Sequence, residues 1–418
     1  MVVPARPGPA RPGVTSRSSS AVSVAGRGVP GGRRSRVVLS EAVGELTLHT
    51  DIPSRSEVEQ LVSVRDPACV SIYVPTSVIT AEARAARIEL KNLSATAIGQ
   101  LEAAKVDAAV VADVQEGLDG LVDDDEFWTV QARSLAVFAS SAGLRTFRLP
   151  NRLTSAVEVA DRFYLKPLLR AVTFPQAAFV LALASGSVRL VEVTPEGPAF
   201  TVDVPGLPRD AASAAGKSSI ADRAPSRRIQ GSEGQKVRLR QFARKVDQAL
   251  RGVLTGLELP LVLAATEPMD AIYRSVNSYP HLAGPGIPGS PEEATDEQLA
   301  ASARTVLDRL YADELTAVRE LFDQRAGAGR ASADVAVVAR AATRGAVDTL
   351  LVDIDEKVPG FVDEETGAVE LAADDAAGYG VVDETARRVL LSGGRVLAVR
   401  RPDVPGGGPV AAILRYAL

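Results

Sequence analysis

The sequence has almost none of the residues that build disulfides, zinc sites or membrane spans. Its 418 residues include one cysteine and two histidines. A single cysteine cannot form an internal disulfide, and no cluster of Cys and His is present that could hold zinc. No apolar stretch approaches the ~18–20 residues that cross a bilayer. We therefore expect a protein of the cytoplasm that uses no metal or cofactor and contacts no membrane.

Basic and acidic residues are unevenly distributed along the chain. The chain carries 47 basic and 52 acidic residues, yet residues 1–40 contain seven Arg and no acid. The rest of the chain is therefore acidic, and a protein with such a body does not coat nucleic acid with its whole surface. Contact with polyanions should be confined to local basic segments, and we expect no DNA partner.

Hydrophobic periodicity predicts an α/β protein with three folded units behind a tail rich in Pro, Gly, Ser and Arg. Apolar runs at 68–76 and 134–140 predict buried strands, and 81–109 predicts a long amphipathic helix. The predicted organisation is a disordered basic tail (1–40), an N-terminal α/β domain (41–170), a central ribonuclease-H-like domain (171–325) and a C-terminal α/β/α sandwich (326–418).

The central unit has a distinctive order of elements. A strand pair at 177–184 and 187–194 flanks the turn Ser185-Gly186, and 199–205 adds a third strand. After an irregular stretch, 206–235, a helix begins at Lys236 with one apolar face: Leu239, Phe242, Val246, Leu250, Val253 and Leu257. A strand at 259–266 and a helix over 292–325 follow. Three antiparallel strands, then helix, strand and helix, is a ribonuclease-H-like order.

A basic patch lies inside the acidic body. Residues 205–245 hold ten basic residues against three acids. Lys236, Arg238 and Arg240 crowd the first turns of the predicted helix, where the macrodipole disfavours cations unless an anion is present. The patch is therefore interpreted as a phosphate site, with Gly231 and Gly234 allowing close backbone approach. Its further candidates are Arg227, Arg228 and Arg244. A solvated basic helix is the alternative interpretation.

Other residues that can carry chemistry are interpreted as structural. His49 and His281 are predicted in loops with no catalytic partner beside them, and Cys69 and Trp128 as core residues. Ala211–Ser219 is similar to a phosphate-binding loop, but it lacks the preceding strand and following helix that such a loop requires.

Several segments resemble a known superfamily. "AFTVDVP" and "GSEGQKVRLRQFARKVDQAL" resemble the central domain of the archaeo-eukaryotic class-1 peptide-chain release factors, in which a GGQ loop precedes an amphipathic helix. "CVSIYVPT", "SVNSYPHL" and "RAATRGAVDTLLV" are similar to the bacterial archaeo-eukaryotic release factor proteins, and the resemblance covers roughly 65–416.

The resemblance implies a three-part protein that acts at the ribosome. Its loop would approach the peptidyl-transferase centre, and its C-terminal domain would resemble kink-turn-binding ribosomal proteins. Gly234 and Gln235 match the second and third residues of GGQ, whose glutamine helps to position the attacking water. Glu233 replaces the first glycine. The N-terminal domain has no NIKS-like stop-codon element.

We therefore expect a ribosome-associated, release-factor-like protein that acts in ribosome rescue, hibernation or stress control. Its partners would be rRNA, together with tRNA and ribosomal proteins, and the sequence leaves peptidyl-tRNA hydrolysis open. One alternative is a metal-dependent ribonuclease-H-like enzyme on tRNA or other RNA, with Glu192 and Asp203 as the available strand carboxylates. The other is a regulatory scaffold that works away from the ribosome.

Overall fold

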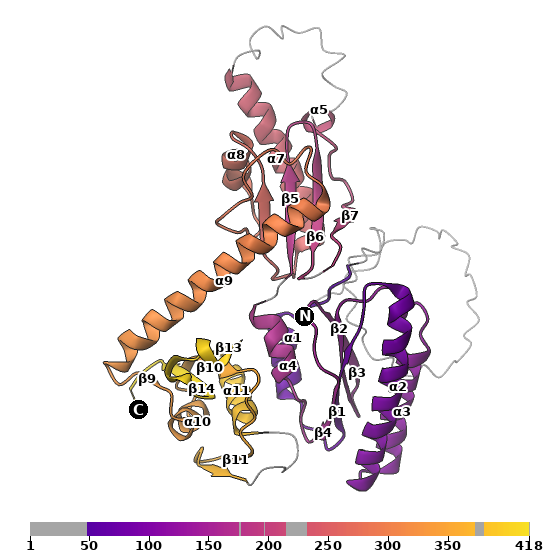
Figure 1. Ribbon diagram of the computed structural model, residues 1–418, viewed down its shortest axis with the longest axis vertical. Helices are drawn as coiled ribbons and strands as arrows, with labels where there is room; N and C mark the ends of the chain where they lie inside the picture. Colours follow the sequence, from indigo (N-terminus) through magenta and orange to yellow (C-terminus); the bar gives the residue numbers. More distant parts are fainter. Residues whose placement is uncertain (1–47, 175–176, 196, 215–231, 373–379, 418) are drawn as a thin grey trace, which may run out of the picture. The chain divides into compact units, whose positions relative to one another are not determined.

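The computed structural model describes residues 48–174, 177–195, 197–214, 232–372 and 380–417. Within these ranges the strands form three four-stranded sheets and one two-stranded sheet, and helices pack on them (Figure 1). The α/β class predicted from the sequence is confirmed. No helix in the described ranges is long and apolar enough to cross a membrane.

The N-terminal sheet is antiparallel throughout. Its strand order is β3 (Gly143–Leu149), β2 (Ser134–Ser140), β1 (Cys69–Pro75) and β4 (Ala156–Ala160). Alternate residues of β1 face opposite layers, as strand geometry requires. Val70, Ile72 and Val74 pack with α2 and α3, whereas Cys69 and Tyr73 belong to the cluster on the other face. The apolar run predicted at 68–76 is therefore a strand buried on both sides.

One helix predicted over 81–109 is in fact two. α2 (Thr80–Ala103) ends where Lys105 takes a positive φ of 60°, and α3 (Ala108–Asp123) then begins. The side chain of Asp107 accepts a hydrogen bond from Ala109 N at 2.9 Å and so caps α3. A capping aspartate inside an apolar, alanine-rich stretch is the signal that separates the two helices.

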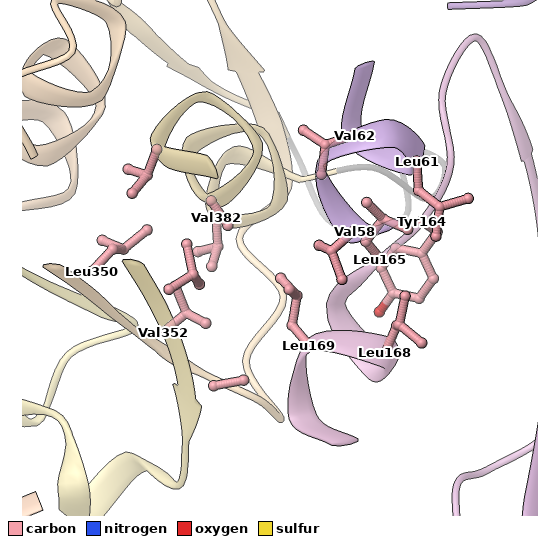
Figure 2. Close-up of a cluster of buried hydrophobic side chains, with 14 of the residues drawn as sticks. Val58, Leu61, Val62, Tyr164, Leu165, Leu168, Leu169, Leu350, Val352 and Val382 are labelled. Carbon is pink, nitrogen blue, oxygen red and sulfur yellow. The ribbon is translucent and has the colours of Figure 1, made fainter. Parts of the chain in front are cut away.

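A second cluster of buried side chains joins elements that are distant in the sequence. Val58 of α1 (Arg55–Ser63) and Leu169 of α4 (Lys166–Thr173) pack in one cluster with Val352 of β10 and Val382 of α11 (Figure 2). β4 ends at Ala160, and the apolar residues that follow it lead into α4 and into this cluster. This cluster crosses the proposed boundaries at 170 and 325, so the division into domains remains a proposal.

The central sheet follows the predicted order of elements. Its strands are β7 (Phe200–Val202), β6 (Val188–Val193), β5 (Ala178–Leu183) and β8 (Leu261–Ala264). β5 runs parallel to β8, and the other pairs are antiparallel. α7 (Ser232–Leu254) and α8 (Met269–Val276) pack on one face of this sheet. α9 (Asp296–Ala326) covers the other face.

The C-terminal sheet is mixed and lies between two layers of helix. Its order is β13 (Arg395–Val399), β10 (Val347–Asp353), β14 (Val410–Leu414) and β9 (Ala331–Ser332), with β10 parallel to β13. α10 (Val335–Thr343) and α11 (Val381–Leu391) cover one face. The end of α9 covers the other face through Phe322. The predicted sandwich is confirmed, and the short antiparallel pair of β11 (Gly360–Val362) and β12 (Val369–Leu371) forms the two-stranded sheet.

Candidate nucleic-acid interface

The helix that carries the candidate residues begins earlier than the sequence predicts. α7 begins at Ser232, so Gly234 and Gln235 lie in its first turn and not in a loop. A single glycine costs a helix about 1 kcal/mol. The run of Gln, Lys, Arg and Leu that follows Gly234 favours helix strongly enough to offset that cost. Gly231, Arg227 and Arg228 lie outside the described residues.

The start of α7 extends beyond the core that anchors the rest of the helix. Leu239, Phe242 and Val246 are buried against the central sheet, as the predicted apolar face requires. In contrast, no side chain from Gln235 to Arg238 is buried, and Val237 is 52% exposed. The side chains of residues 235–238 therefore do not belong to the core, and Figure 1 shows the start of α7 continuing past the ends of the central strands.

This exposed start is strongly basic. No acidic residue occurs between Gly234 and Val246, whereas five basic residues do, all of them exposed: Lys236, Arg238, Arg240, Arg244 and Lys245. Within the described residues, Arg238, Arg240 and Arg244 form no ion pair. Cations near the positive end of a helix dipole are unfavourable in water and favourable beside an anion. The basic side chains predicted for α7 thus lie together at one protruding end of the helix, where a bound anion would stabilise them.

His49 and Glu192, which the sequence does not place near each other, form a buried contact. The carboxylate of Glu192, on β6, accepts hydrogen bonds from Thr50 N at 3.0 Å, Thr50 Oγ1 at 2.6 Å and His49 N at 3.2 Å. The His49 ring stacks on Phe200 with centroids 3.7 Å apart. The prediction of a loop histidine without a catalytic partner missed this contact, because 143 positions separate His49 from Glu192.

That contact weakens the case for a metal-dependent nuclease. Glu192 is 1% exposed and its two oxygens already accept hydrogen bonds. Asp203, the second carboxylate of that hypothesis, is exposed. Phe200 is the register partner of Glu192, so Asp203 lies three residues further along, roughly 10 Å away. Among the described residues no group of three or more His, Cys, Asp or Glu is placed to hold a metal ion.

Comparison with known proteins finds a family model that matches the central segment. Residues 175–313 match the model of the bacterial archaeo-eukaryotic release factor family 11, and they include the central sheet, α7 and the first half of α9. The resemblance predicted from the sequence is confirmed over these residues. No curated protein matches the sequence.

Several solved structures are similar at low identity. The archaeal translation termination factor aRF1 is 15% identical, with 87% of this chain and 99% of that chain covered and a TM-score of 0.22. Dom34 of S. cerevisiae, a translation termination-like factor, is 13% identical over 68% of this chain and 74% of that one, with a TM-score of 0.38. Pelota of Archaeoglobus fulgidus is 13% identical over 90% and 98%, with a TM-score of 0.28. The relation to release factors rests on the family match.

Proposed function

We propose that this protein is a ribosome-associated factor of the release-factor superfamily, acting in the cytoplasm in ribosome rescue, hibernation or stress control. The observation that carries the proposal is the protruding basic end of α7, inside the segment that matches the release-factor family. The sequence contains no NIKS-like codon-reading element, and stop-codon termination is therefore not proposed.

The chemistry of the α7 end suits rRNA. Phosphates are closely spaced along RNA, and Lys and Arg side chains on a protruding helix can contact several of them at once. The helix dipole adds to the attraction for anions at this end. The chain outside its basic segments is acidic on balance, so binding would be confined to basic segments such as this end and would orient the protein. Transfer RNA and ribosomal proteins would complete the contacts at the same ribosomal site.

Pelleting with purified ribosomes tests the proposal. Arg238→Glu/Arg240→Glu should remove most of the protein from the ribosome pellet. Arg84→Glu/Lys91→Glu changes the charge by the same amount at exposed positions of α2 and should leave the pellet unchanged. If the wild type is absent from the pellet, the proposal is wrong. A complex that resists added salt would instead indicate a protein partner, because phosphate contacts weaken steeply with salt.

Peptidyl-tRNA hydrolysis is a separate question at the same helix end. Gln235 is exposed in the first turn of α7, where it could hold a water against an ester. Glu233 adds a carboxylate that phosphates repel and a side chain that restricts φ where the family has glycine. We therefore expect slow release by the wild type, faster release by Glu233→Gly, and none by Gln235→Ala. Equal rates for the wild type and Gln235→Ala would make this end a binding element only.

A further inference from the structure

A groove of about 860 Å³ runs beside the C-terminal half of α7, beyond its first turns. One wall is α7 itself, with Lys245, Gln248 and Gly252. The other wall is the segment between β7 and α5 (Ala211–Ala214), which packs beside α7 and contributes Leu207 and Arg209 (Figure 1). The volume lies within the ~300–1,000 Å³ typical of ligand sites.

A polar stripe connects the groove with the basic end of the helix. Positions that differ by three, four and seven lie on the same face of a helix. Counting back from Gly252, that face presents two amides and two cations: Gln248, Lys245, Gln241 and Arg238. All of these residues are exposed. The groove is therefore the end of a continuous polar track that begins at the basic first turns of α7.

The glycine in the groove keeps it open. Gly252 lies in the last turn of α7, and a Cβ built on it would meet nothing within 4 Å. Alanine at that position would favour the helix, since glycine is the poorest helix former after proline. Neither backbone strain nor close packing therefore requires glycine here. What the missing side chain provides is space in the groove.

The walls of the groove combine the groups that a nucleotide needs. Leu207 and Val253 supply apolar surface against which a base can pack, and the amide of Gln248 can donate to and accept from a base edge. Arg209 and Lys245 supply positive charge. Lys245 Nζ donates one hydrogen bond to Ala214 O at 2.6 Å, which leaves two of its three donors for a phosphate.

We propose that this groove binds one unstacked nucleotide of a single-stranded RNA whose phosphates follow the α7 stripe. A base in a duplex is stacked and paired, and so cannot enter a groove of this kind. The proposal deepens the ribosomal function proposed above, because it names the form of RNA that α7 holds. It can still be tested without ribosomes.

The test is a titration of the full chain against a short, fluorescently labelled, single-stranded RNA, followed by fluorescence anisotropy. Gly252→Phe fills the groove from a position with open space around it, and should weaken binding by about tenfold, in the range of one lost stacked base. Gly99→Phe is the matched control, because Gly99 is also an exposed helical glycine with nothing within 4 Å of its Cβ. The control should bind as the wild type does.

The proposal is overturned if Gly252→Phe binds as tightly as the wild type, or if a duplex of the same sequence competes as well as the single strand. Should Gly252→Phe fail to fold by circular dichroism, Arg209→Ala/Gln248→Ala removes two exposed groove side chains instead and should also weaken binding. If the protein binds single-stranded RNA but does not pellet with ribosomes, the ribosomal function is refuted and the proposed nucleotide site in the groove is not. If it pellets with ribosomes but does not bind single-stranded RNA, only the nucleotide site is refuted.

Discussion

Neutralising three arginines of α7 should make ribosome binding less sensitive to salt. Arg238, Arg240 and Arg244 are exposed, and none of them forms an ion pair within the part of the chain that the structure describes. Each can therefore contact a phosphate, and each contact releases counterions from the RNA. The variant is Arg238→Gln/Arg240→Gln/Arg244→Gln, which removes charge without introducing repulsion.

The size of the effect follows from the number of contacts. Each phosphate contact contributes about 0.7–0.9 to the slope of log affinity against log salt concentration, so three lost contacts lower that slope by about 2–3. A slope difference of about 2 means that, between roughly 50 and 200 mM salt, the wild type loses about 16-fold more affinity than the variant does.

The assay is ribosome binding measured at several salt concentrations. A control variant, Arg84→Gln/Lys91→Gln/Lys105→Gln, removes three exposed cations in and just after α2 and should keep the wild-type slope. Weaker binding by the triple α7 variant with an unchanged slope would refute phosphate binding, because that result means that the arginines contact something other than phosphate.

Three further predictions concern the fold that holds α7. Phe242→Ala empties a fully buried position between α7 and the central sheet and should lower the free energy of unfolding by about 3–5 kcal/mol, as measured with urea. Burial works to raise the pKa of Glu192, but hydrogen bonds from His49 and Thr50 hold it below its ordinary value of 4.5, so its carboxylate stabilises the fold above that pH. The stability gap between the wild type and Glu192→Gln should therefore narrow as the pH falls below 4.5. Burial raises the pKa of Cys69 to about 12, so a thiol reagent should not label the native protein at neutral pH.

Local patterns were enough to predict most of the elements. The apolar run at β1 and the strand pair around Ser185-Gly186 depend on side-chain period and turn chemistry, both of which are read over a few residues. The buried face of α7 was predicted for the same reason, since Leu239, Phe242 and Val246 repeat at helical spacing. The same helical spacing places the basic residues at the start of α7 on its exposed side.

The start of α7, the buried Glu192 contact and the groove could not be predicted from local sequence patterns. Gly231 and Gly234 suggested a loop up to Gln235, whereas the helix propensity of the following residues extends α7 back to Ser232. The contact of His49 and Thr50 with Glu192 spans more than 140 positions. The groove requires a wall from the β7–α5 segment beside a helix that begins 18 residues after α5 ends, and no sequence period encodes such a pairing.

Directed hydroxyl-radical probing of rRNA can locate the basic end of α7 on the ribosome. Because Cys69 is the only cysteine and is buried, a new cysteine at an exposed position would carry an iron chelate alone. Val237→Cys places the probe at the basic end of α7, and Ile88→Cys places a control probe on α2, 64% exposed in the wild type. If this end binds as proposed, Val237→Cys should give strong cleavage of large-subunit rRNA around the peptidyl-transferase centre, and Ile88→Cys a different, weaker pattern. Cleavage from neither position, or the same pattern from both, would contradict the proposed binding.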